Sequence, residues 1–215
     1  MSLKTIQEGL NALGYDAGAA DGDWGPKTEA ALRACIAFRG QPVVTSRPPM
    51  MTSLSSGVSA QKLYQGSARY LVDEIVVHCS ATEPDWMDDF TMAAKVAEIR
   101  RWHVEDRKWR DIGYHWIIDR DGDVAPGRPE TEIGAGVEGH NRGVIHVCLI
   151  GGHGSAGTDR FGAHFTSEQD AALRQLIAQI SARTPIRRIS GHNEWAAKAC
   201  PGFNVPAWLA KGVSR

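Results

Sequence analysis

Residues 191–202 read GHNEWAAKACPG, and residues 76–80, more than a hundred positions earlier, read VVHCS. His78 and His192 each come at the end of an apolar run that predicts a strand, and strand ends are where sites form in α/β domains. With Cys200 they offer two imidazoles and a thiolate, a ligand set that suits zinc. Zinc with three protein ligands keeps its fourth position for water, which becomes a nucleophile near neutral pH.

Sequence spacing alone does not establish this site. His192 and Cys200 are eight positions apart, too far for one helical face, so a loop must bring them together. Lys198 would place a fixed positive charge beside the thiolate. Residue types alone leave open a second interpretation, in which His192 is a surface histidine and Cys200 a half-buried cysteine.

The order of strands and helices predicts the fold class. Strand-like runs alternate with helical segments from residue 74 onward, which favours an α/β domain with a mixed central β-sheet flanked by helices. The strands are expected at residues 74–79, 144–150 and 188–190, with a hairpin of 114–119 and 123–125 about a turn at 121–122. The helices are expected at residues 91–104, 166–182 and 206–211, the second one with Thr166 and Gln169 in a capping box.

Six separated motifs occur in one order between about residues 70 and 212. They read VHCSAT, WH, GYHWIIDRDG, GR, VCLIGG and GHNE-x3-KACPGF. This series resembles the N-acetylmuramoyl-L-alanine amidases of the peptidoglycan-recognition type, as found in phage endolysins.

The resemblance implies a zinc hydrolase that cuts the amide bond between the lactyl group of N-acetylmuramic acid and the L-alanine of the stem peptide. It implies that His78, His192 and Cys200 bind Zn²⁺ and that Tyr114 and Lys198 are catalytic. Lys198 suits the oxyanion as a point charge, and Tyr114 can hydrogen-bond water or the oxyanion and relay a proton. The division of labour between these two side chains stays open, and Tyr114 could also simply be a core residue.

Two positions depart from the family pattern. Many relatives carry a histidine in the loop where this chain has Gly136, and they often read S-I-G-V-C where residues 144–148 read VIHVC. Both changes leave the five site residues in place and bear on substrate contacts.

Other histidines and cysteines are expected to be structural or exposed. His103 and His115 are expected to be structural, and Cys79 and Cys148 to behave as small hydrophobic residues in strands. Histidines in or near the polar, glycine-rich region are expected to be solvated: His146, His153 and His164.

The first 40 residues form a separate pattern. IQ-x2-L-x2-LGY from Ile6 predicts a helix ended by Gly14, DGDWGP is a turn, and residues 27–38 predict a second helix. The pattern resembles the small helical peptidoglycan-binding domain of cell-wall hydrolases, although a plain helical hairpin is the alternative. Residues 54–65 could add a third short helix. We expect a helical wall-binding module and linker at residues 1–65 and the zinc amidase domain at 70–215.

Composition excludes several classes of protein. The net charge is −1 over 215 residues, so no long-range field favours nucleic acid. No apolar run approaches the roughly 18 residues of a membrane span, and the N-terminus has no secretory signal pattern. Four cysteines make no disulfide framework, and a zinc thiolate suits synthesis in a reducing host cytoplasm. We expect a monomer that acts on bacterial peptidoglycan after release through a separate membrane pore.

Two other functions compete with the lytic amidase. A cytosolic amidase that recycles wall fragments meets small soluble substrates and needs no wall anchor, so the N-terminal pattern argues against it. A non-catalytic peptidoglycan-recognition protein belongs to another class; relatives of that type tend to lack the zinc thiolate, and Cys200 is present.

Overall fold

The computed structural model describes residues 3–12, 17–29 and 62–211. The chain forms two units, Met1–Gly57 and Val58–Arg215. Each unit is described by itself, beginning with the larger one.

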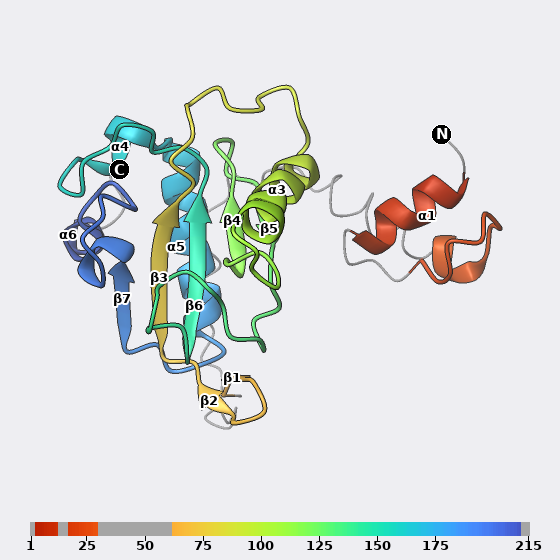
Figure 1. Ribbon diagram of the computed structural model, residues 1–215, viewed down its shortest axis with the longest axis horizontal. Helices are drawn as coiled ribbons and strands as arrows, with labels where there is room; N and C mark the ends of the chain where they lie inside the picture. Colours follow the sequence, from red (N-terminus) through yellow and green to blue (C-terminus); the bar gives the residue numbers. More distant parts are fainter. Residues whose placement is uncertain (1–2, 13–16, 30–61, 212–215) are drawn as a thin grey trace, which may run out of the picture. The chain divides into compact units, whose positions relative to one another are not determined.

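A five-stranded sheet forms the centre of the larger unit, with the strand order β5-β4-β6-β3-β7 (Figure 1). Four strands are parallel to their neighbours, and only β5 is antiparallel, as the hairpin partner of β4. The predicted mixed sheet is therefore confirmed. The strands are β3 (Glu74–Cys79), β4 (Trp116–Ile118), β5 (Val124–Pro126), β6 (Val144–Leu149) and β7 (Arg188–Gly191).

Helices cover both faces of this sheet. On one face, Leu173 of α5 packs with Ile75 of β3 and Val147 of β6, and Figure 1 shows α5 behind these strands. On the other face, Ile99 of α3 packs with Ile117 of β4. The helices are α3 (Met92–Arg101), continued by the π-helical turn η1 (Trp102–Asp106), then α4 (Phe161–His164), α5 (Ser167–Ser181), the 3-10 turn η2 (His192–Glu194) and α6 (Val205–Ala210).

The start of α5 is fixed by the predicted capping box. The Thr166 side chain accepts a hydrogen bond from the Gln169 backbone, and the Gln169 side chain accepts one from the Thr166 backbone. Two of the N–H groups that a helix start leaves without partners are satisfied in this way. The Gln169 amide also donates to Ile118 O and Ile150 O, which ties the helix to the ends of the sheet.

A short hairpin precedes the sheet and belongs to the same unit. Strand β1 (Tyr64–Gln65) pairs antiparallel with β2 (Tyr70–Leu71). The buried Gln65 amide donates to Val144 O and accepts from Gly143 N. The expectation of a helix reaching residue 65 is wrong at its end, because Tyr64 and Gln65 form this strand; residues 54–61 lie outside the described part.

The N-terminal unit begins with helix α1 (Leu3–Ala12). The buried Gln7 amide accepts from Gly22 N and donates to Asp21, to Asp23 O and to Thr28. One helix residue therefore organises the predicted turn. Residues 26–29 begin a second helix; the rest of that predicted helix and the predicted cap at position 14 lie outside the described residues. Within the described ranges of the chain, no helix is long and apolar enough to cross a bilayer.

Candidate metal and catalytic site

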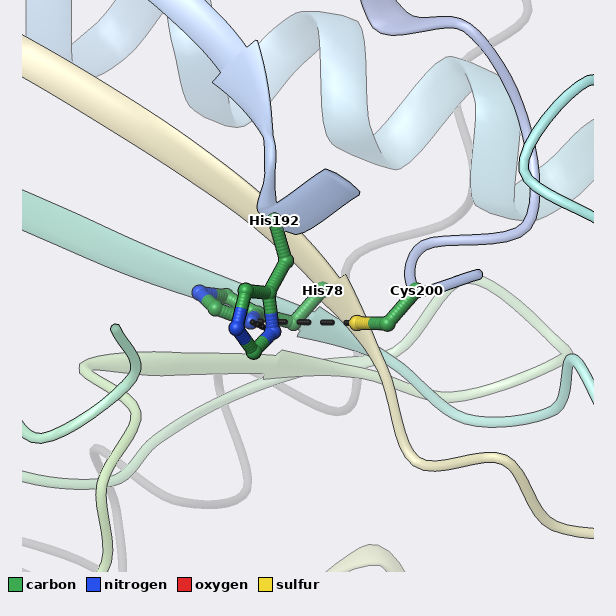
Figure 2. Close-up of side chains that lie close together, drawn as sticks. All are labelled: His78, His192 and Cys200. Carbon is green, nitrogen blue, oxygen red and sulfur yellow. Dashed lines mark hydrogen bonds between the residues drawn. The ribbon is translucent and has the colours of Figure 1, made fainter. Parts of the chain in front are cut away.

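Three side chains that could bind a metal converge at one end of the sheet. The ligand atoms of His78, His192 and Cys200 all lie within 4.8 Å of one another. Nδ1 of His78 is 3.2 Å from Nδ1 of His192 and 3.8 Å from the Cys200 sulfur. Figure 2 shows these groups pointing toward one another. The structure thus brings together all three residues that the sequence predicts as ligands.

Parallel strand pairing explains why the two histidines meet. Strand β3 pairs with β7 so that Val77 lies opposite Gly191. The next residue in each of the two strand segments is a histidine, so His78 and His192 lie side by side at the same level. His78 is the fifth residue of β3, and His192 is the first residue after β7.

The loop after β7 carries Cys200 back to the end of β3. A Cβ added to Gly191 would lie 2.9 Å from Pro201, so a glycine lets the returning loop pack closely against the strand. The backbone N–H of Cys79 donates to the Cys200 sulfur at 3.3 Å. That hydrogen bond fixes the sulfur beside the two imidazoles.

Metal binding by the three groups requires the loss of only one proton, which comes from the Cys200 thiol. Burial lowers the pKa of His78 well below its usual value, and burial and then the charge of Lys198 lower the pKa of His192. Both imidazoles are therefore neutral near pH 7. The side-chain hydrogen bond with the Cys79 thiol and then burial raise the pKa of the Cys200 thiol, so a metal would have to displace its proton.

We expect the metal-free protein to lose stability as the pH falls from about 6.5 to 4.5. Burial lowers the pKa of His103 and His115 to about 4, and it lowers those of His78 and His146 well below 6.5. The unfolded chain therefore binds protons first. This contribution to stability is complete above the unfolded pKa near 6.5 and decreases below it, by roughly 1.4 kcal/mol per pH unit for each proton of difference.

Denaturant unfolding in the presence of a chelator, repeated from pH 8 to pH 4.5, measures this dependence. Above about pH 5.5 the histidines dominate this dependence, because carboxylates with lowered pKa values, such as Glu98 and Asp159, add to the same loss only as the pH approaches their unfolded pKa of about 4. A free energy of unfolding that stays constant across the window would show that the histidines do not carry this linkage.

Tyr114 stands between the ligand group and a pocket. Its ring centroid is 5.1 Å from that of His78. Burial raises the pKa of its phenol well above 10, so the hydroxyl keeps its proton and can donate a hydrogen bond. The pocket has a volume of about 440 Å³ and extends from the end of β3 to α3 and η1. Its lining residues are Ser80, Ile99, Trp102, His103, Asp106, Arg107 and Tyr114.

Lys198 supplies positive charge near the ligand group. Its side chain is exposed, and its charge lowers the pKa values of His78 and His192. The ammonium is therefore close enough to act on the ligand group. All five residues that the sequence predicts for the site lie in or around this one region.

The remaining histidines differ in their exposure to solvent. His103 accepts from Gly113 N, and His115 lies 2.9 Å from Glu132 O, as expected for structural residues, although His103 also lines the pocket. His153 is exposed. His146 is fully buried, so the expectation that it is solvated is wrong. It lies inside β6, a central strand covered on both faces.

A half-buried histidine also departs from the expectation of solvation. His164 is partly buried and pairs with Asp159 at 2.8 Å. Cys79 and Cys148 are buried in strands, which confirms their prediction.

Comparison with known proteins gives the same class of protein as the fold and the site. The family model for N-acetylmuramoyl-L-alanine amidase matches residues 67–203, and the model for the putative peptidoglycan binding domain matches residues 2–45. The endolysin of Escherichia phage T7 is 42% identical over 147 residues, which are 68% of this chain and 91% of the phage protein.

Solved structures show the same fold. The endolysin amidase LysCS from Clostridium intestinale has a TM-score of 0.52 and 25% identity, covering 65% of this chain and 82% of that one. The bumblebee protein PGRP-SA has a TM-score of 0.55 and 22% identity, covering 73% of this chain and 89% of that one.

Fold and site together define a hydrolase on a mixed α/β sheet, with a group of two histidines and one cysteine that could hold a metal. The chain belongs to the N-acetylmuramoyl-L-alanine amidase family. It is a peptidoglycan hydrolase, and this activity fits the relatives better than recycling of soluble fragments or recognition without catalysis.

Proposed function

We propose that this amidase cleaves the bond between N-acetylmuramic acid and L-alanine with a zinc ion held by His78, His192 and Cys200. The observation that carries the proposal is the convergence of their three ligand atoms within 4.8 Å at the ends of β3 and β7. Tyr114 and Lys198 are the proposed catalytic side chains beside them.

Two of the three ligand separations fit zinc, and the third, between His192 and Cys200, is within 4.8 Å. With Zn–N near 2.05 Å and Zn–S near 2.3 Å, a tetrahedral site places two nitrogens roughly 3.3 Å apart and a nitrogen and sulfur roughly 3.6 Å apart. The corresponding distances from His78 Nδ1 are 3.2 Å to His192 and 3.8 Å to Cys200. Two imidazoles with one thiolate also match the ligand chemistry of zinc, and three ligands leave a position open.

The protein groups around the ligands then have distinct tasks. When bound, zinc polarises the amide carbonyl and makes water nucleophilic near neutral pH. Attack on the carbonyl carbon produces an oxyanion, which the Lys198 ammonium stabilises as a point charge. Tyr114 keeps its phenolic proton because burial raises its pKa, so it donates a hydrogen bond to the oxyanion or orients the attacking water.

Analysis of the digestion products tests which bond is cut. Purified sacculi incubated with the protein should release stem peptides whose first residue is L-alanine with a free amino group, because amide hydrolysis transfers a proton to the leaving nitrogen. Mass analysis of the soluble fraction identifies these peptides. Release of disaccharide fragments with intact lactyl–alanine bonds would instead identify a glycosidase and contradict the proposal.

We propose that residues 1–65 form a wall-binding module with its linker and that residues 70–215 form the catalytic domain. The match of residues 2–45 to a peptidoglycan-binding family supports this division, and Trp24 is 53% exposed, as a ring that stacks on sugar would be. We further propose a monomer that is made in the host cytoplasm and reaches the wall through a separate membrane pore.

Removing the N-terminal module should weaken wall binding without harming catalysis. Because tethering raises the local enzyme concentration on a polymer, a protein that begins at Val58 should lyse sacculi more slowly yet keep its activity on soluble muropeptides. Val58 is a suitable start, since β1 and the buried Gln65 amide belong to the larger unit. Sedimentation with sacculi measures the binding.

A single substitution tests wall binding without removing the module. Trp24→Ala should reduce pelleting with little change in thermal unfolding, because the ring is mostly exposed. Equal pelleting of full-length, truncated and Trp24→Ala proteins would show that the module does not anchor the enzyme.

A further inference from the structure

A fourth histidine lies directly behind the proposed ligands. His146 is fully buried in β6, and its Nδ1 is 3.0 Å from Nε2 of His78. His78 therefore presents one ring nitrogen to His192 and Cys200 and the opposite one to His146. A histidine that binds a metal through Nδ1 must carry its proton on Nε2, and that N–H needs an acceptor in a buried site.

Hydrogen bonds and stacking place the His146 ring to be that acceptor. The backbone N–H of His146 donates to Nδ1 of His115, so His115 carries its proton on Nε2 and donates it to Glu132 O. The His115 and His146 rings stack with centroids 5.7 Å apart. Nε2 of His146 is buried and has no hydrogen-bond partner among the described residues. A buried nitrogen without a hydrogen-bond partner does not stabilise the fold. Another role must therefore explain a histidine at position 146.

The loop of residues 134–136 leaves space for this ring only because Gly134 and Gly136 lack side chains. A Cβ at Gly136 would lie 2.5 Å from Nδ1 of His146 and 2.8 Å from Nε2 of His78. A Cβ at Gly134 would lie 2.5 Å from Cδ2 of His146. The two departures from the family pattern, glycine at 136 and histidine at 146, therefore meet at one point in space.

We propose that His146 is a positioning residue for the metal site, which accepts the Nε2–H of His78 and so directs Nδ1 of His78 toward His192 and Cys200. Gly136 makes this possible by leaving the space that the His146 ring fills. The imidazole that contacts Nε2 of His78 therefore belongs to the central strand β6. The inference rests on the proposed zinc site.

Zinc affinity is the primary test, measured on the whole chain by competition with a chromophoric chelator. His146→Leu removes the acceptor at similar volume and should weaken zinc binding by about 10- to 100-fold. His146→Asn keeps an acceptor near the position of Nδ1 and should recover most of the affinity. His153→Leu is the control, because His153 is exposed and lies outside the ligand group.

Two further readouts separate positioning from a structural role. The stability of the metal-free protein should change little in His146→Leu, because one unpartnered buried nitrogen is removed and one is created on His78. The absorption spectrum of the Co²⁺-loaded protein should shift in His146→Leu and return toward that of the unchanged protein in His146→Asn. A large loss of metal-free stability with unchanged affinity would overturn the proposal.

A double-mutant cycle tests the steric partnership with Gly136. Gly136→Ala should weaken zinc binding more in the presence of His146 than in His146→Ala, because in the second background the added methyl group meets only the His78 ring, which can shift into the space that the His146 ring leaves. Additive effects would overturn the partnership. If the unchanged protein bound no zinc, the proposed function itself would fail; if it bound zinc and His146→Leu bound it equally well, only this inference would fail.

Discussion

Cys200→Ala is expected to abolish both zinc binding and lysis of sacculi. The thiolate supplies one of three proposed protein ligands, and its sulfur lies 3.8 Å from Nδ1 of His78. Without it, two neutral imidazoles remain beside the charge of Lys198, which disfavours a cation. We expect zinc affinity to fall by at least about 100-fold, more than for loss of a group that only orients a ligand, and activity to fall to background.

Cys148→Ala is the matched control for this loss. Cys148 is fully buried in β6 on the same face of the sheet and is paired in register with His78, but it is not one of the three converging ligands. Its replacement should cost about 1 kcal/mol of stability through lost packing and leave zinc content intact; lysis is not compared, because the Cys148 thiol also contacts the Tyr114 side chain. Equal zinc content in the Cys200→Ala and Cys148→Ala proteins would remove Cys200 from the site.

Lys198→Ala should lower the turnover rate by about 10²- to 10³-fold, because it removes one group that stabilises the oxyanion. Zinc affinity should stay the same or rise slightly, since the Lys198 charge opposes positive charge at His78 and His192. Turnover of a soluble muropeptide, measured beside zinc content, separates these effects. Lys211→Ala changes an exposed lysine of the terminal helix and serves as the control.

Tyr114→Phe tests the second proposed catalytic side chain with the same two measurements, turnover and zinc content. The ring that packs beside His78 is kept and only the hydroxyl is lost, so turnover should fall more than substrate binding. Near-normal turnover in both Lys198→Ala and Tyr114→Phe would show that neither side chain is catalytic. A fall in zinc content in either protein would instead assign it a structural role at the metal.

Local sequence patterns predicted most of the secondary structure. The apolar run at Glu74–Cys79 is strand β3 with the expected bounds, and Thr166 with Gln169 marked the start of α5. These signals depend on neighbours within a few positions. The end of the predicted helix at 91–104 was less well defined, because the last turn widens into the π-helix η1, for which the local pattern gives no clear sign.

The meeting of the ligands could not be derived from local patterns. His78 and His192 come together because β3 and β7 are neighbouring parallel strands, which is a tertiary feature, and only the order of the family motifs pointed to it. His146 was wrongly expected to be solvated, because a polar, glycine-rich segment lies nearby in the sequence. The run VIHVCLI is apolar on both sides of this histidine, and that pattern of a strand buried on both faces was the available signal.

Elemental analysis of the purified chain, combined with activity before and after chelation, decides whether this hydrolase uses zinc. We expect one zinc per chain, loss of stem-peptide release when a chelator removes it, and recovery when zinc is added back. Metal-free protein that releases stem peptides from sacculi at the full rate would contradict this expectation.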